Sequence, residues 1–180
     1  PPVNAWLLLH QTVLFLHVVA FAITLSAVLR EDWWLLTTRR IDEPRLVRTA
    51  RVVAIGLAVL WASGLALVAV SAVTSPTSWA LSAKLQAKLL VVGVLTVNGW
   101  GLHLWVFPKL RTTDARFELP VLPLAALAAV SSASWVYASF VVVARVVSPW
   151  FSFTGFMALY GVAIGVSLAV AITSTRRLTL

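Results

Sequence analysis

Residues 9–19 read LHQTVLFLHVV and lie within an apolar run that extends from Trp6 to Leu29. An α-helix needs about 20 apolar residues to cross the hydrocarbon core of a bilayer, because its backbone polar groups must be satisfied within the segment. Further runs of this kind cover residues 51–73, 86–107, 121–147 and 153–173, of which the fourth helix is the longest. With 61% hydrophobic residues and a mean hydropathy of +0.95, the sequence predicts an all-α integral membrane protein. We expect one domain over residues 1–180, a bundle of five transmembrane helices.

The net charge of +8 is distributed unevenly along this topology. All six acids and most of the fourteen Lys and Arg follow the first or third helix or lie in the C-terminal tail, and only Lys84, Lys88 and Arg145 lie on the other side. By the positive-inside rule, the N-terminus is outside and the C-terminus is cytoplasmic. The basic excess therefore reports topology and attraction to anionic lipid, and nucleic-acid binding is not expected.

Three histidines, a lysine and an asparagine within the apolar runs are candidates for a functional role. His10 and His17 are seven residues apart, so they point to one face of the first helix, while the third helix carries Lys88, Asn98 and His103. Buried polar residues in membrane helices usually face the bundle interior and are candidates for function. A rise of about 1.5 Å per residue places His10 level with Lys88 and His17 level with Asn98, whereas His17 and His103 differ by about 9 Å in height.

Three interpretations of these residues remain open. A b-type haem takes one or two neutral imidazoles in an apolar slot, which makes His17 and His103 candidate iron ligands and His10, Lys88 and Asn98 candidate cofactor contacts. One haem held by His17 and His103 together requires helix ends that differ by a turn from those predicted. A copper path would also use imidazole. The remaining interpretation is that the histidines hydrogen-bond to neighbouring helices. The sequence has no cysteine, and no catalytic motif predicts a reaction.

Small residues recur in the fourth and fifth helices. Ala125, Ala129 and Ala133 repeat every four residues, and Gly161 and Gly165 form a GxxxG pattern. Such faces allow the backbones of two helices to approach closely. They predict either packing within the bundle or a surface for a membrane-protein partner or a second copy of the chain.

Several segments resemble a broad group of small bacterial membrane proteins. They are LHVVAFAITLSAVLRE, RTARVVAIGLAVLWASGLALV and AKLLVVGVLTVNGWGLHLWVFPKL in the first three helices, with FELP before the fourth. The group includes the HemJ-type protoporphyrinogen oxidases and the membrane domain of the copper-resistance D family. The resemblance to the HemJ type implies haem b and functional roles for His17 and Lys88. The copper-resistance pattern instead matches Asn98 and Pro108.

The sequence departs from the HemJ type in two respects. Leu85 and Gln86 stand where that type has tryptophan and histidine, and a fifth helix is added. We therefore expect a multi-pass protein of the bacterial cytoplasmic membrane that binds a b-type haem and takes part in membrane electron transfer or porphyrin redox chemistry. The alternatives are a copper-handling or permease-like protein and a structural subunit of a larger membrane complex.

Overall fold

The computed structural model describes residues 5–38, 42–74, 82–106, 108, 121–144 and 150–176. Within these ranges the ordered elements are helices: α1 (Ala5–Thr38), α2 (Glu43–Thr74), α3 (Ala83–Gly101), the π-helical turn η1 (Leu102–Val106), α5 (Val121–Val143) and α6 (Phe153–Arg176). Five helical spans in this part of the chain are long and apolar enough to cross a membrane. The predicted all-α class is confirmed, and the helices are those of a multi-pass membrane bundle.

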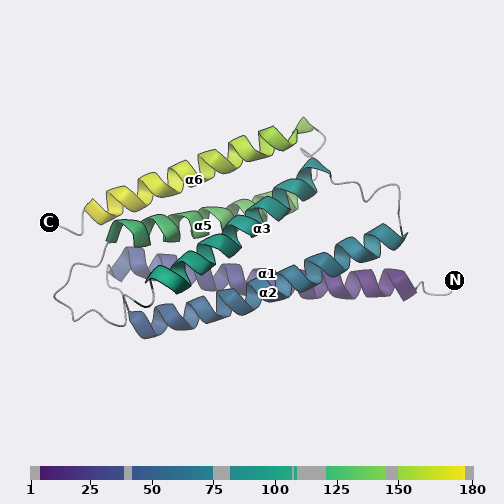
Figure 1. The fold of residues 1–180 in the computed structure, drawn as a ribbon, viewed down its shortest axis with the longest axis horizontal. Coiled ribbons are helices and arrows are strands. Elements are labelled where there is room, and N and C mark those ends of the chain that lie inside the picture. The colour runs from purple at the N-terminus through teal and green to yellow at the C-terminus, as the bar shows by residue number, and fades with distance from the viewer. Residues whose placement is uncertain are drawn as a thin grey trace.

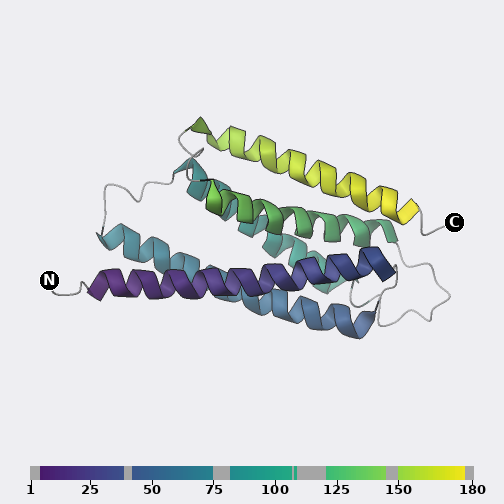
Figure 2. The ribbon, with the colours of Figure 1, turned by 180° about the vertical axis from the view of Figure 1, so that it is seen from behind.

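Successive helices run in opposite directions, so the first turn of α1 and the last turn of α6 lie at opposite ends of the bundle (Figure 1). α1 and α2 form one closely packed pair, and α5 and α6 form another. α3 packs against α5 and α6, and α1 also contacts α5. Seen from behind, α1 runs along the front of the molecule beneath α5 (Figure 2). α2 and α3 make only limited contact with each other, and a cavity lies between them.

The ends of two helices differ from the prediction. α1 continues past Leu29 to Thr38, which makes α1 the longest helix, so the prediction that the fourth helix is longest was wrong. The helix continues because the acidic side chains of this turn are paired with residues of other helices. Glu31 pairs with Arg45 of α2, and Asp32 pairs with Ser132 of α5. α2 begins at Glu43 and so includes the polar residues that lead into the apolar run predicted from residue 51. Pro44 lies in its first turn, where a missing backbone N–H leaves no internal hydrogen bond unmade.

The other helix ends lie closer to the prediction. α3 begins at Ala83 because the Ser82 hydroxyl caps it, accepting a hydrogen bond from the Leu85 amide at 3.3 Å. Its last turn widens into η1, which contains His103. π-helical turns of this kind occur frequently at functional sites. α5 ends at Val143, and α6 extends to Arg176.

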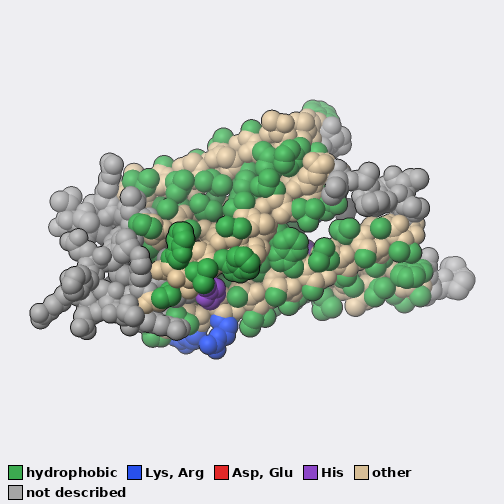
Figure 3. Space-filling model, in the orientation of Figure 1, with side chains coloured by type: hydrophobic (Ala, Val, Ile, Leu, Met, Phe, Trp, Pro, Cys, Tyr) green, Lys and Arg blue, Asp and Glu red, His purple; other side chains and the backbone are tan. Residues whose placement is uncertain are grey.

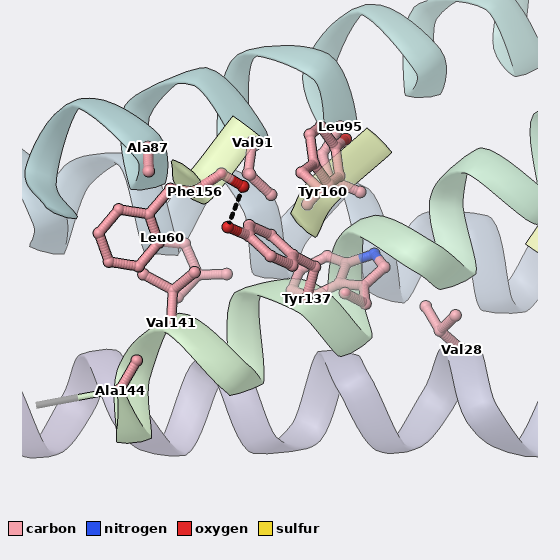
Figure 4. Packing of buried hydrophobic residues seen from close by; sticks show 11 residues of the cluster. Val28, Leu60, Ala87, Val91, Leu95, Tyr137, Val141, Ala144, Phe156 and Tyr160 are labelled. Atoms are coloured by element: carbon pink, nitrogen blue, oxygen red, sulfur yellow. Dashed lines mark hydrogen bonds between the residues drawn. The ribbon is translucent and has the colours of Figure 1, made fainter. Parts of the chain in front are cut away.

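The buried core draws residues from all five long helices, with α3 and α5 contributing the most (Figure 4). Trp135 of α5 and Phe156 of α6 are its largest fully buried side chains. The Tyr137 hydroxyl donates a hydrogen bond of 2.6 Å to the Phe156 carbonyl, drawn as a dashed line in Figure 4. Ser134 and Tyr160 share another bond of 2.7 Å. These bonds fix α6 against α5 inside the apolar core.

Apolar side chains also cover the outside of the helices (Figure 3). In this view the visible Lys and Arg side chains gather at the lower left, near the start of α2. Exposed residues such as Phe15, Val97 and Leu104 have about two-thirds of their surface uncovered, at 67%, 70% and 69%. A surface of this kind suits the hydrocarbon core of a bilayer, where apolar side chains face lipid.

Candidate functional site: a polar seam and a cavity

A seam of polar residues joins α1 to α2. On α1 these residues recur every seven positions, and each meets a small or polar residue of α2 that recurs at the same interval in the opposite direction. The three levels are His17 with Ser63, Thr24 with Gly56, and Glu31 with Thr49. A seven-residue repeat keeps one helix face against its partner, as in a left-handed coiled coil. The predicted polar face of the first helix therefore lies against α2.

The hydrogen bonds around His17 assign its tautomer. His17 Nδ1 lies 2.7 Å from Ser63 Oγ, and Ser63 Oγ lies 2.6 Å from the Val59 carbonyl oxygen. A carbonyl oxygen only accepts, so Ser63 gives its single proton to Val59 and His17 Nδ1 donates to Ser63. In the neutral imidazole, Nε2 then carries a free lone pair. His17 is half-buried, with its ring against Gly64, where a Cβ would lie 3.6 Å from His17 Cε1.

His10, in the first half of α1, and Lys88, near the start of α3, are the remaining candidates. The Lys88 ammonium is close enough to His17 to interact with it electrostatically. Lys88 itself is exposed, and so is its neighbour Gln86. His10 lies one heptad before His17 and is half-buried. His17 of α1 and Lys88 of α3 therefore lie within electrostatic range of each other.

Asn98 and His103 line a cavity of about 320 Å³ between α2, α3 and α5. The Asn98 side chain is buried, and its Nδ2 donates a hydrogen bond of 3.0 Å to the Leu127 carbonyl of α5. His103 is exposed at the end of α3. Trp61 on the α2 wall donates from Nε1 to Thr96 Oγ1 at 3.1 Å and so links α2 to α3. The cavity extends from buried residues such as Asn98 to the exposed His103.

The structure does not bring His17 and His103 together. The Trp61–Thr96 bond sets the α2–α3 register, and the His17–Ser63 bond sets the α1–α2 register. His103 lies seven residues beyond Thr96, away from Ser63, so the two imidazoles are about 14 Å apart along the bundle. Among the described residues, His, Asp and Glu form no cluster of three or more that could hold a metal ion.

Sequence reasoning missed a buried ion pair at the far end of the polar seam. Glu31 is 4% exposed, and its Oε2 accepts hydrogen bonds from Arg45 Nε and from Thr49 Oγ1, both at 3.0 Å. The Arg45 guanidinium also lies over the Trp34 ring, 4.5 Å from its centroid. Trp34 belongs to the sequence WWLL at residues 33–36, and apolar aromatic residues of this kind suit the boundary between lipid and water. Trp33 is 71% exposed and suits that role, whereas Trp34 covers the ion pair.

Asp32 makes a second polar contact between helices. The Ser132 hydroxyl of α5 lies 2.6 Å from Asp32 Oδ2 and 2.9 Å from the Ala128 carbonyl oxygen. The adjacent acids of α1 thus point to two different helices, Glu31 to α2 and Asp32 to α5. The Glu-Asp dipeptide at 31–32 was the available signal, because two acids inside a continuous helix need partners.

The two small-residue patterns have different environments. Ala129 and Ala133 of α5 are buried, and the Ala129 carbonyl accepts a hydrogen bond of 2.9 Å from Ser167 of α6. The GxxxG residues Gly161 and Gly165 are exposed on α6, and a Cβ at either would meet no described atom within 4 Å. The alanines therefore pack within the bundle, whereas the glycines face outward.

Comparisons with protein-family models, with curated proteins and with solved structures found no match.

Proposed function

We propose that the protein is a b-type haem-binding protein of the bacterial cytoplasmic membrane, with its N-terminus outside, that takes part in membrane electron transfer or porphyrin redox chemistry. The observation that carries the proposal is the His17–Ser63 hydrogen bond, which leaves Nε2 of the neutral imidazole free to bind iron. Metal-binding histidines commonly donate their other ring N–H in this way, which fixes the orientation of the ring.

The residues around His17 fit a haem better than a copper ion. Haem iron receives four nitrogen donors from the porphyrin, so one or two imidazoles from the protein suffice. A copper site built from protein ligands alone needs more donors, and the described residues offer no such cluster near His17. Gly64 presents no side chain beside the ring, and the Lys88 ammonium could pair with a porphyrin carboxylate. When bound, the haem would supply one-electron chemistry.

Absorption spectroscopy of protein purified after haem-replete expression tests this proposal. We expect a Soret band in the wild type and its loss or a strong shift in His17→Ala, because the substitution removes the axial nitrogen. Ser63→Ala should weaken haem binding about 10- to 100-fold, because it removes the partner of Nδ1. His10→Ala is the matched control on the same helix face and should change the spectrum much less. His103→Ala should leave it unaltered, given its distance from His17.

Two results would remove the proposal. One is a wild-type protein without a Soret band after haem-replete expression. The other is a His17→Ala protein that inserts into the membrane and keeps the wild-type haem spectrum. Either result would leave the His17–Ser63 bond as a packing contact between α1 and α2.

A second candidate function, a structural subunit of a larger membrane complex, is supported by the outward-facing glycines of α6. A GxxxG face packs closely against another helix, and within the described chain no side chain covers it. Gly161→Leu with Gly165→Leu should abolish co-purification of a partner subunit or self-association in crosslinking. Val162→Leu, at a neighbouring position that is 63% exposed, is the control. If both proteins behave alike, this candidate fails.

A further inference from the structure

The two contacts of the Ser132 hydroxyl indicate whether Asp32 carries a proton. Ser132 Oγ lies 2.6 Å from Asp32 Oδ2 of α1 and 2.9 Å from the Ala128 carbonyl oxygen of α5. A hydroxyl has one proton to donate, and a carbonyl oxygen only accepts. Beside an ionised Asp32, Ser132 could direct its proton to only one of these oxygens, and the other contact would join two acceptors. If Asp32 is protonated, Oδ2–H donates to Ser132 and Ser132 donates to Ala128, so both contacts are hydrogen bonds.

The charges around Asp32 favour the protonated form as well. In the described part of the chain Asp32 forms no ion pair, and the adjacent Glu31 carboxylate adds a charge of the same sign. Arg45 of α2 is bound by Glu31, and α5 carries no Lys, Arg, His, Asp or Glu over residues 121–144. A desolvated carboxylate without a counter-charge is costly, so such a group usually takes up a proton instead.

Ser132 also fixes where along the bundle this carboxyl group lies. α5 runs from Val121 to Val143, and Ser132 is its central residue. The helix is one of the spans that are long and apolar enough to cross a membrane. Water is absent from the core of a bilayer, so solvent does not replace the missing counter-charge beside the middle of such a helix.

We propose that Asp32 and Ser132 form a proton-binding site between α1 and α5, in which Asp32 is a neutral carboxylic acid at neutral pH. The two adjacent acids of α1 then differ in state: Glu31 is ionised and paired with Arg45, whereas Asp32 holds a proton against Ser132. Asp32 can thus give up and regain a proton inside the bundle, as the carboxyl groups of membrane proton relays do. The site is separate from His17, and the proposal does not rest on haem binding.

Infrared spectroscopy distinguishes the two states of a carboxyl group, because a protonated acid has a carbonyl stretch well separated from the carboxylate bands. The purified full chain is measured at neutral pH in micelles of a detergent that has no carbonyl group. We expect the wild type to show a protonated-acid band that shifts in D₂O. Asp32→Asn should remove this band. Glu31→Gln is the matched control at the adjacent position and should keep it, because Glu31 is ionised.

Ser132→Ala tests the position of the proton without altering the acid. If Asp32 Oδ2–H donates to Ser132 Oγ, the variant should retain the protonated-acid band but move it to higher frequency, because the acid loses its hydrogen bond. Ser139→Ala is the control. Ser139 lies in the same helix and donates only to the Trp135 carbonyl, so its loss should leave the band unchanged.

Denaturant unfolding of the same variants supplies an independent readout. Asparagine offers an N–H donor to Ser132 in place of the acid's O–H, so Asp32→Asn should keep the wild-type midpoint, whereas Glu31→Gln should lower it. A wild type without a protonated-acid band would overturn the proposal, as would a band that persists in Asp32→Asn, disappears in Glu31→Gln or stays in place in Ser132→Ala. A midpoint that falls as far in Asp32→Asn as in Glu31→Gln would also overturn it.

Discussion

The Glu31 carboxylate is buried between two membrane helices, where two hydrogen-bond donors stabilise it. Its side chain is 6% exposed, while its partner Arg45 is 27% exposed. Glu31→Gln keeps the shape but leaves the guanidinium without its counter-charge, so we expect the free energy of unfolding to fall by about 1 to 3 kcal/mol. The loss should be below the roughly 3 to 5 kcal/mol typical of fully buried pairs, because water reaches Arg45. Denaturant unfolding in micelles measures it.

A double-mutant cycle separates the ion pair from the rest of the site. Arg45→Met alone leaves the Glu31 carboxylate without its charged partner, whereas Glu31→Gln with Arg45→Met removes both charges. If the pair is coupled, the double variant should be more stable than the sum of the two single losses indicates. Strict additivity would show that the contact at 3.0 Å contributes no stability.

At the residue scale, sequence alone identifies polar groups but not their partners. His17 could be predicted as a candidate because an imidazole is rare within an apolar run, and its position on one face followed from helix geometry. Its hydrogen bond to Ser63 could not be predicted, because that bond depends on the register of α2 against α1. Trp135 gave no signal in sequence, because an indole inside an apolar helix resembles any core aromatic until its donor is found unpaired.

At the scale of helix elements, Gly56 sets the distance between α1 and α2. A Cβ at this position would collide with Thr24 Oγ1 and would also crowd the Thr24 Cβ and Cγ2 atoms. These atoms sit at the base of a stiff β-branched side chain, so they cannot move aside without a shift of the helix. Gly56→Ala should therefore lower the free energy of unfolding by about 1 to 3 kcal/mol, measured by denaturant titration.

Gly93→Ala is the matched control for this substitution. Gly93 lies within α3, and a Cβ there would meet no described atom within 4 Å. Alanine is favoured over glycine in a helix by about 0.5 to 1 kcal/mol, so this variant should be neutral or slightly more stable. If Gly56→Ala were as well tolerated as Gly93→Ala, the close approach at Thr24 would not limit the α1–α2 packing.

The existence of all five helices could be predicted, because runs of about 20 apolar residues leave few alternatives in a bilayer. The length of α1 could not. Hydropathy falls at Arg30, so the pattern ends the membrane helix at Leu29, whereas the structure continues it for two and a half turns. That extension depends on Arg45 and Ser132, which approach only once α2 and α5 are packed.

At the scale of the whole molecule, the positions of basic residues predict how the bundle crosses the membrane. Arg30, Arg48 and Arg51 lie where α1 ends and α2 begins. Lys84 and Lys88 lie in the first turns of α3, at the opposite end (Figure 1). The arginine-rich end should be cytoplasmic, because positively charged segments beside membrane helices are retained there.

Cysteine labelling in spheroplasts tests this orientation. The chain has no cysteine of its own, so only the introduced thiol can react. Thr74 at the end of α2 and Thr38 at the end of α1 are both exposed and lie at opposite ends of the bundle (Figure 1). An impermeant thiol reagent should label Thr74→Cys in intact spheroplasts and Thr38→Cys only after permeabilisation. The reverse pattern would mean that the bundle has the opposite orientation, with the Glu31–Arg45 pair at the outer surface. The two threonines are matched in residue type and exposure class, so a difference in labelling reports the side of the membrane.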